Sequence, residues 1–481
     1  MRLEQDSLGT MEIPSNAYFG IHAKRATQNF PNHELFSLDW YKAVGLIKKV
    51  YYLAWEEFRK ESKLKYPTTT LHCRDINPNF IAALIQSSEE VWSGKWFDQF
   101  IVGGITGGAG TSINMNINEI ITNRALDLLG LPLGDYQSIH PLDHANIFQS
   151  TNDVIPSALK IAAMEKLKEL SYAVDSTKQN IETLEKSFSN RIRIAYTQMQ
   201  EAVPSTWGRF FSNYADAFAR DWWRISKCEE RIKTINLGGS AIGTGLTVPR
   251  FIIMRIFEIL KGLTNLPLNR SENLCDTTSN LDSLVEVHAI LKAHTVNLEK
   301  LASDLRLSSS DLFKHPAFQV LPVQEGSSIM PGKYNPVISE YIISICHKIR
   351  SNDQLITSLA GLGVLDLNPY LPIIGHALLD SISLLINANL SLNDNLLNNI
   401  QKLQDLNQYL NSPVIATALI PHIGHTLAHK LVTYMKDHKT DVIKANEVLQ
   451  VLSPAVLDDL LTPAKLTSLG FTLKELRGGK C

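Results

Sequence analysis

Apolar residues recur at helical spacing through the middle of the chain. Ala163, Leu167, Leu170 and Val174 stand at i, i+4, i+7 and i+11, which places them on one face of an α-helix. Two later segments repeat this spacing, namely Ile342, Ile345, Cys346 and Ile349, and then Leu378, Ile382 and Leu385. Sustained alternation with a period of two, which is typical of strands, is scarce. The pattern predicts a mostly α-helical protein with a central bundle of long helices.

The texture of the chain changes twice, and the changes predict three domains. Residues 1–149 combine short apolar runs with frequent Pro and Gly, which indicates a mixed, mostly helical N-terminal domain. Residues 150–408 hold the long helical segments, and residues 409–481 form a small C-terminal helical domain. We expect its helical pieces to be broken by Pro413, Pro421, Pro454 and Pro463. The apolar faces of the central helices are too extensive for one chain to cover, which favours an oligomer.

The amino-acid composition and net charge argue against some classes of protein. Of 481 residues, 44% are hydrophobic and 20% are charged, and the formal net charge is only -2. That balance is not typical of a basic nucleic-acid binder or of an acidic tail, so we expect no nucleic-acid partner.

Cysteine usage and the N-terminus bear on location. Cys73, Cys228, Cys275, Cys346 and Cys481 are odd in number, scattered and never in a C-x-x-C pair, which argues against a disulfide framework or a zinc site. The first residues lack the apolar core of a signal peptide, and no run approaches the about 20 apolar residues of a membrane span. The expectation is a cytoplasmic protein with no membrane partner.

A glycine-rich stretch, residues 103–112, precedes a predicted helix. Glycines allow the backbone to approach a ligand closely, and the N-terminus of the following helix offers unpaired N–H groups to an anion. The stretch has no G-K-[ST] and no G-x-G-x-x-G after a clear strand, so it does not indicate a nucleotide site. An anion site and a tight structural turn both remain open.

Two shorter polar stretches carry candidate ligands. Residues 149–153, Gln-Ser-Thr-Asn-Asp, stand ahead of the helix that holds Pro156, where an ordinary N-cap explains them equally well. Residues 197–204, Thr-Gln-Met-Gln-Glu-Ala-Val-Pro, are interpreted as the end of a helix before Pro204.

A fourth stretch, residues 326–336, reads Gly-Ser-Ser-Ile-Met-Pro-Gly-Lys-Tyr-Asn-Pro between two helical regions. It offers hydroxyls, a cation and an amide in a segment too rich in Gly and Pro to be helical. A plain surface loop rarely carries Ile329 and Met330 at its centre, so we expect a loop that folds over a ligand.

Three histidines invite a metal hypothesis. His422, His425 and His429 form H-x-x-H-x-x-x-H, but no carboxylate accompanies them within a helical turn. Pro421 and Gly424 also disturb the helix that such a site requires, so we expect no metal site.

The fourth stretch resembles the signature loop of the fumarase/aspartase superfamily, G-S-S-x-M-P-x-K-x-N-P, at every fixed position. The other three stretches are similar to conserved regions of the family in the right order and separation. Further similar segments extend the resemblance over essentially the whole chain: residues 2–9, 17–22, 25–26, 29–30, 238–245 and 421–425. The resemblance implies a three-domain, mostly helical subunit. It also implies a homotetramer with a twenty-helix core and composite active sites built from three subunits.

The resemblance also implies a mechanism and a set of residues. The proton to be removed lies next to a carboxylate, and its removal builds a second negative charge there, so positioned donors are needed. By resemblance Ser327 is the base, acting as its alkoxide. The implied substrate-binding residues are Thr111, Ser150, Thr151, Asn152, Thr197, Gln198, Ser328, Lys333 and Asn335. No cofactor is implied.

Position 198 favours one reaction within the family. Fumarases carry His where this chain has Gln198, paired with a glutamate that matches Glu340. Glutamine does not titrate, so it cannot relay a proton to a leaving hydroxide, whereas an ammonium group leaves already protonated. The residues favour an ammonia-lyase that converts L-aspartate to fumarate.

Other functions stay open. The chain departs from the family pattern at Thr106, Leu142, Thr247 and Tyr334, so a class II fumarate hydratase or a lyase for an N-substituted aspartate remains an alternative. An inactive structural relative is a more remote one, because such a protein has no need of Ser327.

Overall fold

The computed structural model describes residues 1–32, 36–314, 316–404 and 407–477. It divides into two compact units, each assembled from three segments of the chain. Unit 1 comprises Met1–Ser171, Arg224–Ala293 and His347–Leu385, and unit 2 comprises Tyr172–Trp223, His294–Cys346 and Ile386–Cys481. Cys481 itself lies outside the described residues.

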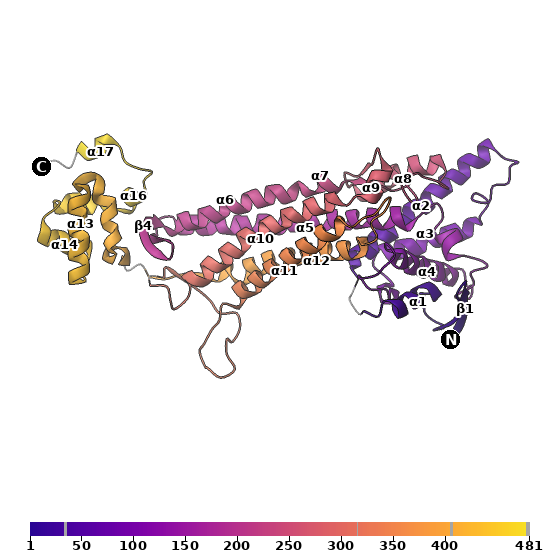
Figure 1. Ribbon diagram of the computed structural model, residues 1–481, viewed down its shortest axis with the longest axis horizontal. Helices are drawn as coiled ribbons and strands as arrows, with labels where there is room; N and C mark the ends of the chain where they lie inside the picture. The colour runs from indigo at the N-terminus through magenta and orange to yellow at the C-terminus, as the bar shows by residue number, and fades with distance from the viewer. Residues whose placement is uncertain (33–35, 315, 405–406, 478–481) are drawn as a thin grey trace. The chain divides into compact units, whose positions relative to one another are not determined.

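Helices dominate both units, as the periodicity predicts (Figure 1). Four long helices have a large part in each unit, namely α5 (Thr151–Ser187), α10 (Asp282–Ser308), α11 (Val337–Ala360) and α12 (Leu371–Asn395). A fifth, α6 (Trp207–Ser226), extends from unit 2 into unit 1 by its last three residues, 224–226. Every residue that the apolar spacing placed on a helix face is buried, from Ala163 to Leu385. The prediction of a mostly α-helical fold with long bundled helices is therefore confirmed.

Unit 1 opens with the antiparallel hairpin of β1 (Arg2–Asp6) and β2 (Gly9–Ile13). Its helices are α1 (Ile21–Asn29), α2 (Leu38–Lys65), α3 (Pro78–Trp92), α4 (Thr111–Leu128), α7 (Cys228–Ile232), α8 (Arg250–Thr264) and α9 (Leu274–Ser279). A 3-10 turn (Phe97–Gln99), a π-helical turn (Pro141–Ala145) and the short parallel pair β5 (Thr234–Ile235) and β6 (Asn269–Arg270) complete it. The indole of Trp40 on α2 donates to the Ile155 carbonyl at 3.1 Å, which ties α2 to α5 inside the core.

Unit 2 contains the bundle helix α6 (Trp207–Ser226) and two antiparallel pairs: β3 (Ile192–Thr197) with β4 (Gln200–Thr206), and β7 (Phe318–Val320) with β8 (Ile400–Lys402). Short 3-10 turns cover Leu397–Asn399, Gln408–Asn411 and Pro413–Leu419. The C-terminal helices are α13 (Ile420–His438), α14 (Val442–Leu449), α15 (Pro454–Leu460), α16 (Pro463–Leu466) and α17 (Leu473–Arg477).

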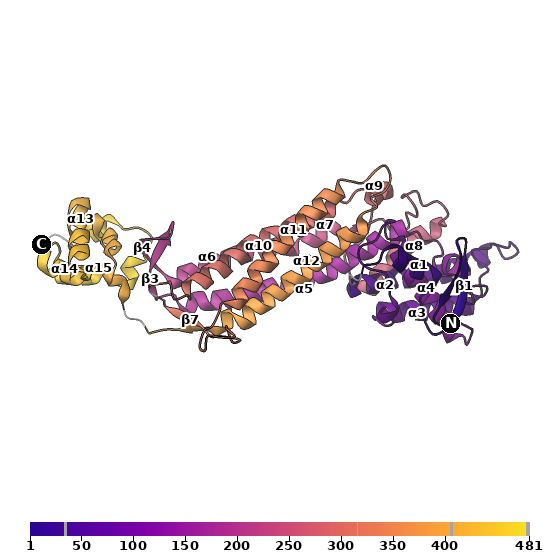
Figure 2. The same ribbon diagram turned by 60° about the horizontal axis from the view of Figure 1, so that its bottom comes forward.

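Buried polar side chains join neighbouring helices of the bundle in unit 2, where α6 runs beside α10 in both views (Figures 1 and 2). His294 on α10 is fully buried and bonds Asp221 on α6 at 2.9 Å and Asn389 on α12 at 3.1 Å. Asn389 also accepts from Thr177 on α5 at 3.0 Å. Such fully satisfied networks specify the relative register of helices that apolar contacts alone leave free to slide.

Two local predictions were wrong. Residues 197–204 belong to the β3–β4 hairpin rather than to a helix end, because Gln198 and Met199 both have positive φ, 52° and 63°, and reverse the chain between two strands. The C-terminal prolines do not break helices. All four occupy the first or second position of a helical segment, where the missing N–H has no intrahelical acceptor to lose.

One expectation about apolar runs was also wrong. Residues Leu371–Asn399 are long and apolar enough to cross a membrane by length and composition alone. Within the fold, most of this apolar stretch is buried. Ser381 on this helix bonds His288 of α10 at 2.9 Å and Asn352 of α11 at 3.0 Å, as expected of a helix inside a bundle.

Candidate active site

The predicted site residues fall into two groups, one in each unit. Thr111, Ser150, Thr151 and Asn152 belong to unit 1. The others belong to unit 2: Thr197, Gln198, Ser327, Ser328, Lys333 and Asn335.

The glycine-rich stretch leads into α4. Gly108 and Gly110 have φ of 81° and 92°, a conformation that L side chains rarely adopt. A Cβ on Gly110 would also lie 3.1 Å from Ile155 Cγ2 on α5. Thr111 begins the helix, and no side chain caps its N-terminus, so the turn leaves helix N–H groups available to an anion.

Residues 150–153 form the start of α5. Ser150 Oγ accepts from the Asn152 N–H at 3.3 Å, and Asp153 Oδ1 accepts from the Ser150 N–H at 3.0 Å. This reciprocal pair is a variant of the capping box in which Ser150 accepts from the second helical N–H rather than the third, so the N-cap interpretation of the stretch holds. Thr151 and Asn152 are both half-buried. Asn152 Nδ2 donates to the Ala241 carbonyl at 2.8 Å.

A buried polar network that the sequence did not indicate joins α4 to the start of α5. Lys48 on α2 is fully buried and donates from Nζ to Asn114 Oδ1 at 2.8 Å and to Asn146 Oδ1 at 3.1 Å. Asn114 Nδ2 in turn lies 3.3 Å from Thr151 Oγ1. Thr111 and Thr151 are therefore held on two helices that one network connects. The available signal was the position of Lys48 on the apolar face of α2, between Val44 and Tyr51.

Asp153 anchors the other side of this network. Its Oδ2 accepts from Tyr51 Oη at 2.9 Å and from the backbone N–H groups of Gly238 and Ser240 at 3.1 and 3.2 Å. Burial raises the pKa of Asp153 to about 6, while the four donors pull it down. Burial likewise lowers the pKa of Lys48 to about 7, opposed by the charge of Asp153. The start of α5 thus rests on buried groups whose protonation depends on their surroundings.

A cavity of about 700 Å³ lies beside Thr111 in unit 1. Its lining includes Gly107, His22 and Glu119. Glu119 accepts from the N–H groups of Gly20, His22 and Ala23, at 2.9, 2.8 and 3.2 Å, so its carboxylate caps the N-terminus of α1. Burial raises the pKa of Glu119 to about 8 against these donors.

In unit 2, Thr197 and Gln198 stand at the tip of the β3–β4 hairpin. Both side chains are exposed, and Thr197 pairs with Gln200 across the turn. Gln198 lines a cavity of about 1080 Å³ together with residues of α6 and α10.

The loop of residues 326–336 is closed on itself. Gly326 N donates to the Lys333 carbonyl at 3.1 Å, and Asn335 Nδ2 donates to the Gly326 carbonyl. A Cβ on Gly326 would lie 2.4 Å from the Lys333 carbonyl oxygen and 2.8 Å from the Asn335 nitrogen, so this closure requires glycine.

Ser327 occupies the start of the closed loop. Its Oγ accepts from the backbone N–H groups of Met330 at 3.0 Å and Ile329 at 3.3 Å. Two N–H donors directed at one hydroxyl oxygen stabilise negative charge on that oxygen. Ser328 is exposed beside it.

Lys333 adds a positive charge to the same loop. It is exposed and forms no ion pair with any described residue. The apolar tip is uncovered too, with Ile329 83% exposed and Met330 47% exposed. Between this loop and the β3–β4 hairpin, the described part of the chain has no hydrogen bond or ion pair, so no polar contact joins Ser327 to Gln198 within unit 2.

The three C-terminal histidines lie on α13, which Gly424 interrupts with φ 75° and ψ 169°. The expected disturbance of this helix at Gly424 is confirmed. Within the described ranges, no three His, Cys, Asp or Glu side chains cluster as metal ligands. The four described cysteines form no disulfide with one another.

Comparison with known proteins places this geometry in a family. Residues 9–351 match a family model described as lyase. The chain is 35% identical over 474 residues to an aspartate ammonia-lyase from Bacillus sp, covering 98% of each. Among solved structures it is similar to the fumarate lyase:delta crystallin from Brucella melitensis bound to cobalt, with a TM-score of 0.88, 32% identity, and 97% and 100% of the two chains covered.

The recombinant class II fumarase from Schistosoma mansoni is also similar, with a TM-score of 0.85, 26% identity, and 96% and 98% of the two chains covered. The match to the lyase model spans well over half the chain, and the aspartate ammonia-lyase match covers nearly all of it. The chain therefore belongs to the lyase family of the fumarase/aspartase superfamily and is a carbon–nitrogen lyase of the aspartase type.

Proposed function

We propose that this enzyme is an aspartate ammonia-lyase, which eliminates ammonia from L-aspartate to give fumarate. The observation that carries the proposal is the identity of 35% to an aspartate ammonia-lyase over 98% of both chains. A relative from Escherichia coli strain K12 with the same name is also 35% identical, over 432 residues.

The proposed base is Ser327. As an alkoxide it takes a proton from Cβ of the substrate, the carbon bonded to the side-chain carboxylate. The electron pair moves into that carboxylate to give a dianionic aci-carboxylate. The dianion then collapses to the double bond as the amino group leaves. The two N–H groups that point at Ser327 Oγ support this role, because they favour the charged form of the hydroxyl.

The substrate carries two carboxylates, and the proposed ligands offer donors for both. Lys333 has no carboxylate partner among the described residues, so its charge is available to a substrate. Asn335 and Ser328 lie in the same loop, and Thr197 lies on the hairpin. Thr111, Ser150, Thr151 and Asn152 stand at two helix N-termini, whose N–H groups and dipoles favour anions.

Gln198 supports ammonia as the leaving group. Its amide does not titrate in the range where enzymes transfer protons, so it cannot supply the proton that hydroxide needs to leave as water. The substrate amino group is already protonated at neutral pH and departs as ammonia without an acid. The second candidate is a class II fumarate hydratase, and the structural similarity to the Schistosoma mansoni fumarase supports this alternative.

A substrate panel on the purified protein tests the choice. With L-aspartate we expect absorbance near the fumarate band to rise readily, and with L-malate very slowly. A missing proton relay worth about 3–5 kcal/mol separates the two kcat/KM values by roughly 10²–10⁴-fold. A kcat/KM for malate equal to that for aspartate would establish the hydratase instead. Activity with neither would point to an N-substituted aspartate or to an inactive relative.

We further propose a homotetramer with active sites composed of residues from three subunits, a three-domain subunit divided at 149/150 and 408/409, and a cytoplasmic location. Large apolar side chains exposed on bundle helices of unit 2 support the assembly: Tyr172 on α5, Trp223 on α6, Val296 on α10 and Leu390 on α12. A separate apolar core in the C-terminal segment, which includes Leu419, Leu431 and Leu457, supports the second boundary.

A further inference from the structure

Arg193 on β3 has an unusual environment for a cation. Its guanidinium carbon lies 4.7 Å from the centroid of the Trp207 ring and 5.3 Å from that of Phe210. Its Nε is buried and has no hydrogen-bond partner. No described carboxylate forms an ion pair with it, and Asp304, Tyr196 and Tyr214 act on it only from a greater distance.

The aromatic rings compensate this charge only in part. They interact with the faces of the planar guanidinium, whereas its N–H donors project in the plane and need acceptors of their own. A buried donor without an acceptor destabilises the fold, and more so when it is charged. Burial accordingly lowers the pKa of Arg193 below its ordinary value. The terminal N–H groups of the guanidinium, unlike the buried Nε, can take acceptors from an oxyanion bound beside them.

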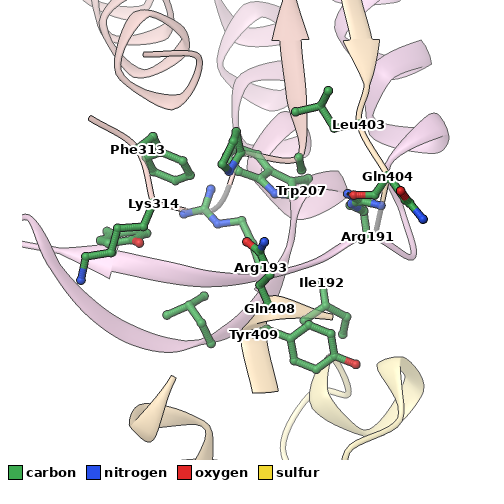
Figure 3. Close-up of a pocket in the computed structure, with 14 residues that line it drawn as sticks. Arg191, Ile192, Arg193, Trp207, Phe313, Lys314, Leu403, Gln404, Gln408 and Tyr409 are labelled. Carbon is green, nitrogen blue, oxygen red and sulfur yellow. The ribbon is translucent and has the colours of Figure 1, made fainter. Parts of the chain in front are cut away.

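The guanidinium of Arg193 borders a cavity. It has a volume of about 330 Å³, and Figure 3 shows the Arg193 guanidinium directed into the space between Trp207, Phe313 and Lys314. Arg191 and Lys314 also line it, on opposite sides of Arg193 in Figure 3, and none of the described lining residues is acidic.

The two additional cations are placed differently from Arg193. Arg191 donates to the Gln404 carbonyl at 2.8 Å, which keeps it at the cavity wall. Lys314 is 71% exposed, and its Nζ stays 3.6 Å from Glu201 Oε1, a loose pair that leaves it able to turn toward a ligand. The cavity thus has a partly buried cation packed between aromatic rings and an exposed one beside it.

We propose that this cavity binds a small oxyanion, the phosphate or carboxylate group of a metabolite, through a two-pronged contact with Arg193. A planar guanidinium matches the two oxygens of either group with parallel hydrogen bonds. The site is separate from Ser327 and Lys333 and does not depend on the proposed reaction. Because Arg193 and Thr197 share strand β3, a ligand here is positioned to affect the hairpin that carries Gln198.

Isothermal titration calorimetry on the full chain tests the proposal, with inorganic pyrophosphate, inorganic phosphate and succinate as separate probes at low ionic strength. We expect at least one probe to bind once per chain, and Arg193→Gln to weaken that binding at least tenfold. The comparison of phosphate-based probes with succinate identifies which oxyanion the cavity prefers. Arg193→Lys, which keeps the charge but not the planar fork, should give an intermediate loss.

Two further variants fix the location of binding. Lys402→Gln removes one positive charge in the same unit from a side chain that does not line the cavity, and should leave affinity within about twofold. Lys333→Met should also leave it unchanged, whereas loss of binding in Lys333→Met alone would place the anion in the candidate active site. The proposal fails if no probe binds the wild-type protein, or if Arg193→Gln binds as tightly while its circular dichroism spectrum and melting temperature match the wild type.

Discussion

At the scale of single residues, Ser327 combines accessibility with two hydrogen-bond donors. Its Oγ accepts from Ile329 and Met330 N–H groups, so the oxygen can carry charge, while its own proton is directed to neither. An ordinary serine hydroxyl is a poor base at neutral pH, and we propose that the two local N–H donors are what would make Ser327 a stronger acid and supply its alkoxide. The role of Ser327 therefore depends on the conformation of the loop as much as on the side chain.

Ser327→Ala removes the proposed proton acceptor and leaves the substrate ligands in place. We expect kcat to fall by roughly 10²–10⁴-fold while aspartate still binds, because the lost hydroxyl acts in the proton-transfer step and not in substrate binding. Steady-state kinetics together with calorimetric binding of aspartate measure both quantities. Ser328→Ala is the matched control and should lose much less. A near-normal kcat in Ser327→Ala would remove this residue from the mechanism.

Lys48 makes the stability of the fold depend on pH. Burial lowers its pKa from 10.5 to about 7, so between these values the unfolded chain carries a proton that the folded chain does not. The unfolded state then binds more protons, and the free energy of unfolding rises with pH by up to about 1.4 kcal/mol per pH unit. The full gain in the free energy of unfolding is present above pH 10.5, and it is lost as the pH falls from 10.5 to about 7.

We therefore expect Lys48→Met to flatten the rise in the free energy of unfolding across that window. Urea unfolding at several pH values and one fixed protein concentration measures the slope. Lys49→Met, on the same helix but with its Nζ 3.1 Å from Glu89, controls for the loss of a lysine. Equal slopes in wild type and Lys48→Met would show that Lys48 stays protonated in the folded state.

At the scale of elements, short irregular segments carry the candidate ligands and long helices hold them in place. The loop of residues 326–336 is closed by backbone and side-chain bonds rather than by an apolar core, since most of its side chains are exposed. Its conformation can therefore change with little effect on global stability, whereas Ser327 depends on it directly.

Gly326→Ala tests this separation. The added Cβ would meet the Lys333 carbonyl at 2.4 Å, so the loop must open and displace Ser327 and Lys333. We expect kcat/KM to fall by about 10²-fold with only a small change in melting temperature, because misplacement by about 1 Å suffices for such a loss. Gly262→Ala on α8, where a Cβ meets nothing within 4 Å, should change neither. An unchanged kcat/KM in Gly326→Ala would show that closure of the loop is not needed.

At the scale of the whole molecule, apolar surface on the bundle remains uncovered in the single chain. Val296 on α10 is 55% exposed and Tyr172 on α5 is 78% exposed, although both lie in the middle of long helices. Scattered exposure of this kind is common, but side chains on several bundle helices together indicate a surface that associates.

We expect light scattering to give a mass four times that of the 53.7 kDa chain. Val296→Glu places a charge on the surface that we propose to associate, and should shift the protein toward smaller species with a parallel loss of activity. Leu469→Glu, at a fully exposed position outside the bundle, should leave mass and activity unchanged. A stable, active monomer would rule out composite sites from three subunits.

The sequence alone determined the helical architecture, because apolar spacing reports which face of a helix is buried. Residues such as Leu167, Ile349 and Ile382 are buried as that spacing requires. The sequence also determined the motif around Ser327. Eleven consecutive residues contain both the Gly and Pro residues that prevent a helix and the hydroxyl, amine and amide groups of the candidate site. Local pattern failed at residues 197–204, where pairing with a second strand and two positive φ angles decided the structure.

Tertiary structure alone decided which groups become charged, unpaired or fixed. In the sequence, Lys48 looks like an ordinary helical lysine. In the fold it is removed from water, and its Nζ donates to two asparagine side-chain oxygens. In the sequence, Arg193 looks like an ordinary surface residue. In the fold its guanidinium packs against the rings of Trp207 and Phe210. Periodicity records whether a side chain faces the core, whereas its protonation and its partners depend on groups tens of residues away, which only folding brings within a few ångströms.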